Sequence, residues 1–404
     1  MANACTLQTA LTGASSGDEI WVSAGVHYPG SNRNDTFALQ SGVAVYGGFG
    51  GTETGCEQRD WAANVAVLSG DIDQNDLADP NGVVEDTAHI TGTNSYHVVT
   101  GSGVATTAAL GGFVITAGQA NVAGNNNGGG LLNTASSPRL ANLTVSGNWA
   151  SRGGGGIYND SSSPVLSHVT LIGNAAGEDG GGMYNTHSSP TLNHVTFSGN
   201  SATAGGGGMF NYDGSNPTLD NVTFVGNTAY RGGGICNADT GLVAGAGPAL
   251  NGVTLTGNAA VTRGGGIFNH HSRAAVTDGV FLGNTAGESG GGMANSSSAV
   301  VVVQAIFSGN QSASGGAVRN EYSSLILTNA TIAGNQASGA GGGISNDNSG
   351  PFIQNTVVWG NASGSGGADL HNGANSTPTI RYSLVGGYNP GAWTRARRAP
   401  TGGR

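Results

Sequence analysis

The sequence predicts an all-β fold, a parallel β-helix (solenoid) whose short strands wind around one axis with about 26 residues per coil. An apolar residue, one intervening residue and an asparagine recur ten times, in most cases 26 residues apart, and three apolar columns align between the copies. No window shows the apolar period of a helix, and 75 of the 404 residues are glycine. The recurring asparagines are Asn133, Asn159, Asn185, Asn211, Asn237, Asn269, Asn295, Asn320, Asn346 and Asn372.

Residues 1–118 lack the regular repeat but keep its alternation of short apolar runs and turn residues. Such runs, bounded by Gly, Asn, Asp and Ser, are typical of strands. We therefore expect this stretch to form an N-terminal cap and longer, irregular coils of the same β-helix. The runs lie at residues 20–22, 43–46, 65–68, 97–99 and 112–115.

The first strand of each regular coil, within residues 119–385, ends at the recurring asparagine. The residue two positions before the asparagine is always apolar, as in Ile157 and Met183, so alternation along the strand places it inside. The residue between them varies from tyrosine and phenylalanine to cysteine, serine and arginine, which places it outside. The asparagine falls on the inward side at a corner, where its amide can bond the asparagine of the next coil and form a ladder.

Two further strands complete each predicted coil. A second apolar column follows seven residues after the asparagine in most copies, for example at Leu166 and Leu192. A third strand places valine and then leucine or phenylalanine inside, with the intervening threonine outside. Each copy then closes with Gly-Asn, a pair suited to a turn with positive φ. The final stretch, residues 386–404, holds arginines among proline and glycine without an apolar pattern, so we expect it to be disordered.

The composition argues against several classes of function. The thirteen basic residues are all arginine and the net charge is −10. Because neutralising phosphates needs a basic face, nucleic acid is not an expected partner. No stretch approaches the roughly 18 apolar residues of a membrane span, so we expect no transmembrane segment. The first residues show neither the charged region nor the apolar region of a signal peptide.

Glycine-rich copies such as GGGIYN, GGGMYN and GGGMFN are each followed by a segment such as FSGN, FVGN or FLGN. These copies resemble the repeats of polymorphic outer membrane proteins. More broadly, over about residues 17–385, the chain is similar to right-handed parallel β-helix repeat proteins of bacterial surfaces. The resemblance implies a right-handed, pectate-lyase-like fold and an extracellular or cell-surface location.

That resemblance implies no single activity, because the superfamily contains lyases, hydrolases, epimerases, adhesins and spacers. The N-terminal block GDEIWVSAGVHYP is similar to large secreted bacterial β-helix proteins with C-terminal anchoring domains. Neither a signal peptide nor such an anchoring region is visible here, which indicates a fragment or an incomplete gene product.

A column of aromatic residues beside glycines is the first candidate site. Tyr158, Tyr184, Phe210 and Phe268 occupy the outward position before the asparagine. Rings exposed at the spacing of the coils can stack against sugar rings, and the neighbouring glycines leave room for close approach. The alternative is that the rings stack on one another or lie under a loop and only stabilise the solenoid. The hypothesis is a glycan-binding surface built on these four residues.

Four aspartates in the segment GDIDQNDLADPNG form the second candidate. Asp71, Asp73, Asp76 and Asp79 are closely spaced oxygen ligands that suit a hard cation such as calcium. The segment is not an EF-hand loop, since Asp76 stands where that loop requires glycine. A solvated acidic loop is the alternative, and no other cofactor is predicted.

Charged residues before the glycine runs mark a third candidate. Arg152 and Glu178 lie one coil apart and can meet, as a polysaccharide lyase requires, but exposed ladder pairs worth about 0–1 kcal/mol are the alternative. His168 and His194, also one coil apart, make at most a weak metal site. Acids such as Asp239 fall in turns one at a time, so no catalytic residue is predicted. The charged corner residues are Arg152, Glu178, Asp179, Arg231, Arg263 and Glu288.

The sequence therefore favours a secreted or cell-surface β-helix protein that acts as an adhesive or structural module and binds glycans. Its expected partner is an extracellular glycan or a molecule on a host or neighbouring cell surface. The alternative is a polysaccharide-active enzyme, a pectate-lyase-like lyase on the same fold. A catalytic coil should break the repeat with clustered Asp, Arg or Lys, and no copy does so clearly.

Overall fold

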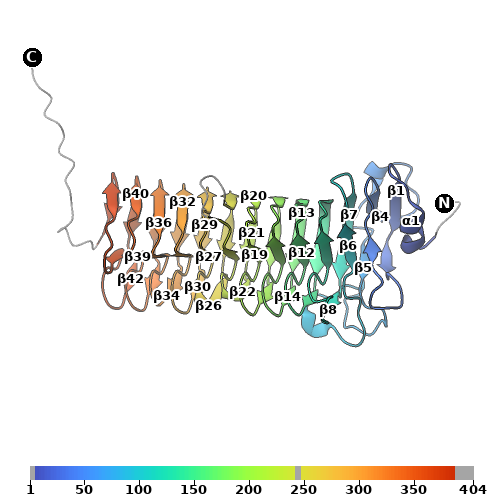
Figure 1. Ribbon diagram of the computed structural model, residues 1–404, viewed down its shortest axis with the longest axis horizontal. Helices are drawn as coiled ribbons and strands as arrows, with labels where there is room; N and C mark the ends of the chain where they lie inside the picture. Colours follow the sequence, from blue (N-terminus) through green and yellow to red (C-terminus); the bar gives the residue numbers. More distant parts are fainter. Residues whose placement is uncertain (1–4, 242–246, 387–404) are drawn as a thin grey trace, which may run out of the picture.

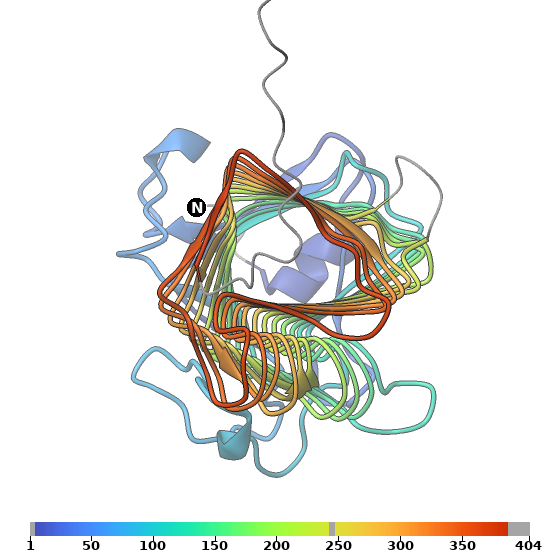
Figure 2. The same cartoon turned by 90° about the vertical axis from the view of Figure 1, so that its left-hand side faces the viewer.

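The computed structural model describes residues 5–241 and 247–386 as a single-stranded right-handed parallel β-helix, the predicted all-β fold. Its coils stack along one axis from the N-terminal to the C-terminal end (Figure 1). Seen along this axis, the coils superimpose as a closed outline with a smaller lobe on one side (Figure 2). The tail expected to be disordered, residues 386–404, lies outside the described residues except for Gly386. None of the described helices has the length and apolar character needed to cross a membrane.

A short helix, not predicted from the sequence, covers the N-terminal end of the core. α1 (Leu7–Gly13) begins after Thr6, whose side chain accepts a hydrogen bond from the backbone N–H of Thr9. Leu7 and Leu11, one turn apart, are both buried in the main core. Because a helix this short is marginal alone, burial of its two leucines is what stabilises it. In Figure 2 the helix lies across the far end of the solenoid.

The irregular N-terminal coils contain strands where the apolar runs predict them. β1 pairs with β4 and β4 with β7, all in parallel. Two 3-10 helices, Cys56–Gln58 and Thr87–His89, lie in the long connections. The strands are β1 (Glu19–Ser23), β2 (Gly25–His27), β3 (Phe37–Ala38), β4 (Ala44–Phe49), β5 (Ala66–Ser69), β6 (Val99–Ser102) and β7 (Ala109–Thr116).

The predicted first strands form a parallel sheet along the solenoid. Each strand pairs with its equivalent one coil on, so that Ile157 pairs with Met183 and Asn159 with Asn185. Among the described residues this sheet comprises β3, β6, β9 (Leu131–Thr134), β12 (Ile157–Asp160), β15 (Met183–Thr186), β19 (Met209–Tyr212), β23 (Ile235–Ala238), β27 (Ile267–His270), β31 (Met293–Ser296), β35 (Val318–Glu321), β39 (Ile344–Asp347) and β43 (Leu370–Asn372).

The second and third predicted strands lie in one large parallel sheet. A residue with positive φ lies between them, such as Asn142 in β10 (Arg139–Ser146), His168 in β13 (Val165–Ile172) and His194 in the next coil. In β10 and β13 the two strands run together, and in later coils they are separate. The later pairs are β16 (Thr191–Asn193) and β17 (Thr196–Ser198), β20 (Thr218–Asp220) and β21 (Thr223–Val225), β24 (Ala249–Asn251) and β25 (Thr254–Thr256), β28 (Ala275–Thr277) and β29 (Val280–Leu282), β32 (Ala299–Val303) and β33 (Ile306–Ser308), β36 (Ser324–Thr328) and β37 (Thr331–Ala333), β40 (Phe352–Gln354) and β41 (Val357–Trp359), and β44 (Thr379–Arg381) and β45 (Leu384–Val385).

A fourth short strand in each regular coil was not predicted. It follows the Gly-Asn turn and pairs in a parallel ladder on the side of the lobe (Figures 1 and 2). Its inward alanines Ala176, Ala202 and Ala229 form a small cluster of their own. These strands are β8 (Gln119–Ala120), β11 (Trp149–Ala150), β14 (Ala175–Ala176), β18 (Ser201–Ala202), β22 (Thr228–Arg231), β26 (Ala259–Arg263), β30 (Thr285–Ala286), β34 (Gln311–Ser312), β38 (Gln336–Ala337) and β42 (Ala362–Ser363).

Two buried asparagine ladders run along the axis. The predicted ladder is confirmed, because each Nδ2 donates to the Oδ1 of the next asparagine at 2.8–2.9 Å. It starts at Asn133, since the preceding coil carries Gly101 at this position. The second ladder, which was not predicted, joins the asparagines of the Gly-Asn turns from Asn148 to Asn361. Amide pairs therefore satisfy two corners of the regular coils, except at the start of the first ladder, where Asn133 Oδ1 is buried without a partner among the described residues.

Candidate functional site

The outward position of the first strand carries the predicted aromatic column. Strand alternation directs Tyr158, Tyr184, Phe210 and Phe268 away from the main core. The ring centre of Tyr184 lies 5.0 Å from that of Tyr158 and 5.1 Å from that of Phe210. Cys236 separates Phe210 from Phe268 in the pairing register. The structure thus brings all four predicted residues into one line along the axis.

Part of this column is packed rather than exposed. Phe210 and Phe268 keep only 8% and 5% of their surface exposed, so the predicted exposure is wrong for these two rings. With Cys236 and Ala294 they form a second apolar cluster outside the main core. The cause is the glycine-rich segment that leaves the fourth strand and returns over the column. A Cβ atom on Gly205 would lie 2.8 Å from the Phe210 ring, so glycine permits this close approach.

A line of cavities lies between the aromatic column and the returning segment. The largest has a volume of about 360 Å³. One of about 240 Å³ shares four lining residues with it, and a small one of about 30 Å³ lies towards the N-terminal side. We call this line the junction groove. It is lined by Asn127, Arg152, Tyr158, Glu178, Asp179, Tyr184, Ala204, Gly205, Phe210, Tyr230, Arg231, Cys236, Ala238, Thr262, Arg263, Phe268, His270, Glu288 and Ser296.

The predicted charged corners border the same groove. Arg152 Nε lies 3.3 Å from Glu178 Oε2, and both side chains are exposed, as expected for a ladder pair of small energy. Arg263 Nη1 lies 2.8 Å from Glu321 Oε2, and its Nε lies 3.7 Å from Glu288 Oε2. The aromatic and the charged candidates, which the sequence presented as separate, therefore belong to one site.

Arg231 differs from these arginines. Within residues 5–241 and 247–386 it makes no ion pair. Its guanidinium carbon lies 5.6 Å from the ring centre of Tyr230 and 6.0 Å from that of Phe268. These contacts hold the cation against aromatic faces at the largest cavity, where its N–H donors can reach a bound anion.

Asp179 is a partly buried acid in the groove. The pKa of Asp179 is raised to about 6, mainly by burial and to a smaller extent by the neighbouring charge of Glu178. A hydrogen bond from the backbone N–H of Gly205, at 2.7 Å, and the charge of Arg152 act in the opposite direction. A carboxyl group of this kind changes its charge near neutral pH.

The four predicted calcium ligands lie in a loop of the N-terminal region. Asp71 accepts two backbone N–H groups of this loop, Asp73 accepts one, and Asp79 accepts two in its own turn. Asp76 Oδ2 accepts a hydrogen bond from Asn94 Nδ2 at 2.6 Å. Burial raises the pKa of Asp76, and repulsion from Asp71 and Asp73 adds to this shift. Each carboxylate thus already supports the loop, and calcium binding stays a prediction.

His168 and His194, which the sequence presents as at most a weak metal site, form a stacked pair. The rings of His168 and His194 lie 5.2 Å apart and nearly parallel, and both residues have φ of 52°. This arrangement of the two rings is explained by stacking at the spacing of the coils and by the left-handed backbone at this corner.

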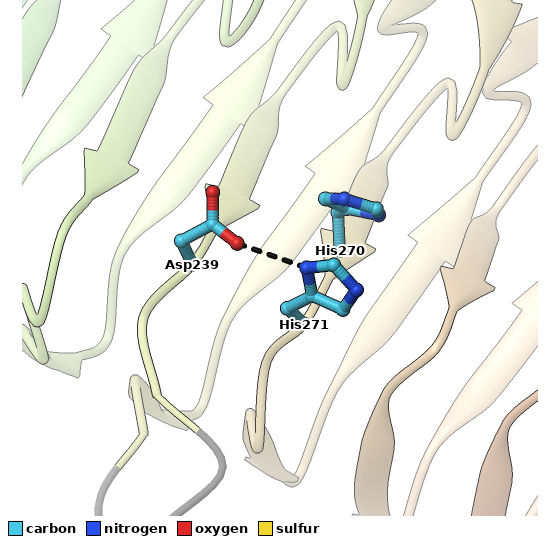
Figure 3. A group of neighbouring side chains, drawn as sticks. All are labelled: Asp239, His270 and His271. Atoms are coloured by element: carbon cyan, nitrogen blue, oxygen red, sulfur yellow. Dashed lines mark hydrogen bonds and ion pairs between the residues drawn. The ribbon is translucent and has the colours of Figure 1, made fainter.

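A cluster of Asp239, His270 and His271 was not recognised from the sequence. Their ligand atoms lie within 4.8 Å of one another, and His271 Nδ1 lies 2.9 Å from Asp239 Oδ1 (Figure 3). In the sequence, Asp239 stands as a single acid in a turn. The available signal was the His-His pair at the same corner one coil on, with His271 placed 32 positions after Asp239.

Comparison with known families finds one match. The Chlamydia polymorphic membrane protein repeat matches residues 142–160 and 221–238. These segments contain the Gly-Asn turn or the strand that ends at the recurring asparagine. No curated protein matches the chain.

Three solved structures are similar to the chain at low identity. The catalytic unit of the thermostable GH87 α-1,3-glucanase from Streptomyces thermodiastaticus strain HF3-3 is 12% identical, with a TM-score of 0.37 over 96% of this chain and 67% of that one. The A-module of the Azotobacter vinelandii mannuronan C-5 epimerase AlgE4 is 11% identical, with a TM-score of 0.30 over 95% and 93%. The Yersinia enterocolitica family 28 exopolygalacturonase is 11% identical, with a TM-score of 0.32 over 95% and 75%. The chain is a right-handed parallel β-helix protein, and two of its segments match the Chlamydia polymorphic membrane protein repeat.

Proposed function

We propose that this chain is a secreted or cell-surface β-helix module that binds a linear glycan in the junction groove and acts in adhesion. The partner is a polysaccharide or a glycan on a host or neighbouring cell. The polymorphic membrane protein repeats support the surface location. The observation that carries the binding proposal is the largest of these cavities, where aromatic rings meet Arg231, which has no ion-pair partner in the described part of the chain.

The lining of this cavity suits a sugar chain. Phe210 and Phe268 offer an apolar floor, and Tyr230, 43% exposed, offers a ring at the rim. Such rings pack against the C–H faces of sugars, while Asp179 and Arg231 can bond hydroxyl groups. The groove follows the axis of the solenoid, so successive units of a linear polymer would meet equivalent positions on successive coils.

Arg231 favours an acidic glycan in the groove. Arg152 and Arg263 have carboxylate partners, whereas Arg231 has none among the described residues. A guanidinium held against aromatic rings binds a carboxylate or sulfate group without first breaking an internal ion pair. We therefore expect uronate-containing or sulfated chains to bind more tightly than neutral ones.

A glycan array of neutral, uronate-containing and sulfated polysaccharides tests the proposal. Tyr230→Ala and Arg231→Gln should each weaken binding at least about tenfold. Tyr322→Ala and Arg139→Gln are matched controls, since both residues are exposed and lie outside the groove. Binding to no glycan, or equal loss in the control variants, would contradict the proposal.

A second candidate is cleavage of the bound polysaccharide. Asp179 favours it, because an acid with its pKa near 6 in a binding groove suits proton transfer at neutral pH. Incubation with uronate polymers, with and without calcium, should then release unsaturated products, and Asp179→Asn should abolish the release. If polymers bind without any product, the chain is a binding module only.

A further inference from the structure

We propose that Asp239, His270 and His271 bind a divalent transition-metal ion, such as zinc, at the edge of the junction groove. Two imidazoles and one carboxylate are a ligand set that zinc and related ions accept. Figure 3 shows the three side chains converging from two neighbouring coils. The site is separate from the aspartate loop considered for calcium, and its ligands suit a softer ion than calcium.

The fold brings the three side chains together at one corner. His270 is the last residue of β27 and pairs with Ala238 of β23, one coil earlier. Asp239 and His271 follow these strands with φ of 51° and 46°, both left-handed. Consecutive side chains of a strand point to opposite faces, but the left-handed residue interrupts this alternation. The rings of His270 and His271 therefore lie on the same side, with centres 3.9 Å apart.

The distances fit coordination. All three ligand atoms lie within 4.8 Å of one another, and the Asp239 Oδ1 to His271 Nδ1 distance is 2.9 Å. Two ligand atoms on one tetrahedral ion, each about 2.0–2.2 Å from it, lie about 3.3–3.6 Å apart, so this pair needs to separate by only about 0.5 Å. His270 then has only to rotate its half-exposed ring to complete the set.

The surroundings predict a modest affinity and an open coordination position. Three protein ligands leave at least one position of a tetrahedral ion to water or to a bound molecule. His270 lines both larger cavities, so this position faces the junction groove. Arg231 and Arg263 lie close enough to act on His270 electrostatically. The carboxylates of Glu288 and Glu321 offset Arg263, whereas Arg231 weakens cation binding.

The chain itself provides a matched control. Two coils earlier the same corner holds a second histidine and aspartate pair, with His187 Nε2 2.8 Å from Asp213 Oδ2. The residue before His187 is Thr186, where the proposed site has His270. Both places therefore hold a histidine and aspartate pair, and of the two only the proposed site has a third ligand, His270.

Titration of the metal-free full chain with zinc chloride by isothermal calorimetry tests the proposal. One zinc ion per chain should bind. His270→Ala and Asp239→Asn should each weaken the binding at least about tenfold, and His187→Ala should leave it unchanged. Cobalt should give the absorption bands of a histidine-bound ion that His270→Ala removes.

Three results would overturn the metal site: no saturable binding, binding unaffected by His270→Ala, or equal loss in His187→Ala. Circular dichroism of each variant confirms that the fold is kept, since all these side chains are at least partly exposed. The glycan array, repeated after chelation, separates this proposal from the proposed function, because either kind of binding can be lost without the other.

Discussion

At the residue scale, one column of outward positions explains why the site exists. Tyr184, Phe210, Cys236 and Phe268 occupy equivalent places on successive strands, yet of these only Tyr184 keeps partial exposure. Glycines such as Gly205 opposite the column let the returning segment approach the rings. Where Cys236 replaces an aromatic ring, less volume fills the space between strand and lobe, and the largest cavity lies there. A smaller side chain in a packed column thus leaves room for the cavity.

Replacing Asp179 with asparagine should change the pH dependence of stability. The pKa of Asp179 is about 6 in the folded chain, against 3.8 for an ordinary aspartate. Between these values the folded chain binds more protons than the unfolded chain, so this group makes stability fall as the pH rises. Asp179→Asn keeps an acceptor for the Gly205 N–H and removes the buried charge. It should be more stable than wild type by about 1–2 kcal/mol near neutral pH and similar below about pH 4.

Thermal melting from about pH 4 to pH 8 measures this difference. The two melting temperatures should coincide at the acidic end, separate between about pH 4 and pH 6, and keep a constant difference at higher pH. A constant offset between wild type and variant at every pH would show that the carboxyl group is not titrating in this range.

At the element scale, the asparagine ladders hold the corners of the coils. Asn211 donates to Asn237 and accepts from Asn185, with all three nearly inaccessible to water. Each strand pairs with the strands of the coils before and after it, and the asparagine on each strand bonds in the same order. The ladder therefore runs along the axis together with the sheet. Because an amide has one acceptor and two donor hydrogens, a column of asparagines can bond in one direction without an unpaired group inside it.

Asn211→Ala should destabilise the chain more than Asn372→Ala. The first change leaves two buried amide groups unpaired, a cost of about 2–5 kcal/mol. Asn372 ends the ladder and is partly exposed, so its loss affects one group that water can reach, and about 1 kcal/mol is expected. Chemical denaturation of both variants gives the comparison. Equal shifts would mean that the ladder does not act through buried amide pairs.

The sequence predicts elements whose side chains repeat a visible pattern and misses those that do not. The first three strands of each coil are predictable because apolar residues such as Met183 and Phe197 recur in register. The fourth strand is often two residues long, as in Ser201–Ala202, too short to show alternation. In α1 the only signal is the pair Leu7 and Leu11, and burial against the core, not propensity, decides the structure.

The candidate site is predictable in its parts but not in its assembly. The aromatic column and the charged corners follow from the repeat, and both lie where the coil order places them. That they share one groove depends on the path of the glycine-rich segment over the column, which no local pattern specifies. The cluster at Asp239 also requires the left-handed turn at His271, since a continuous strand would direct His270 and His271 to opposite faces.

At the scale of the whole molecule, the solenoid is held by contacts between neighbouring coils. In the regular region each strand pairs with its equivalents one coil before and one coil after. Stability is then approximately a sum over coils and their interfaces, so separate regions can open independently. The groove crosses several coils, and its geometry depends on the stability of those coils rather than of the chain as one unit.

A cavity in one coil should therefore have a local effect. Phe224 is fully buried and stacks on Phe197 at 4.6 Å, so Phe224→Ala should cost about 3–5 kcal/mol. Hydrogen exchange followed by mass spectrometry should show faster exchange around residues 195–260, at the groove, with little change beyond about residue 320. Ile332→Ala, fully buried near the other end, should show the reverse distribution. If both variants accelerate exchange equally in every coil, the solenoid unfolds as one cooperative unit, and a change in any coil would affect the groove as much as a change within it.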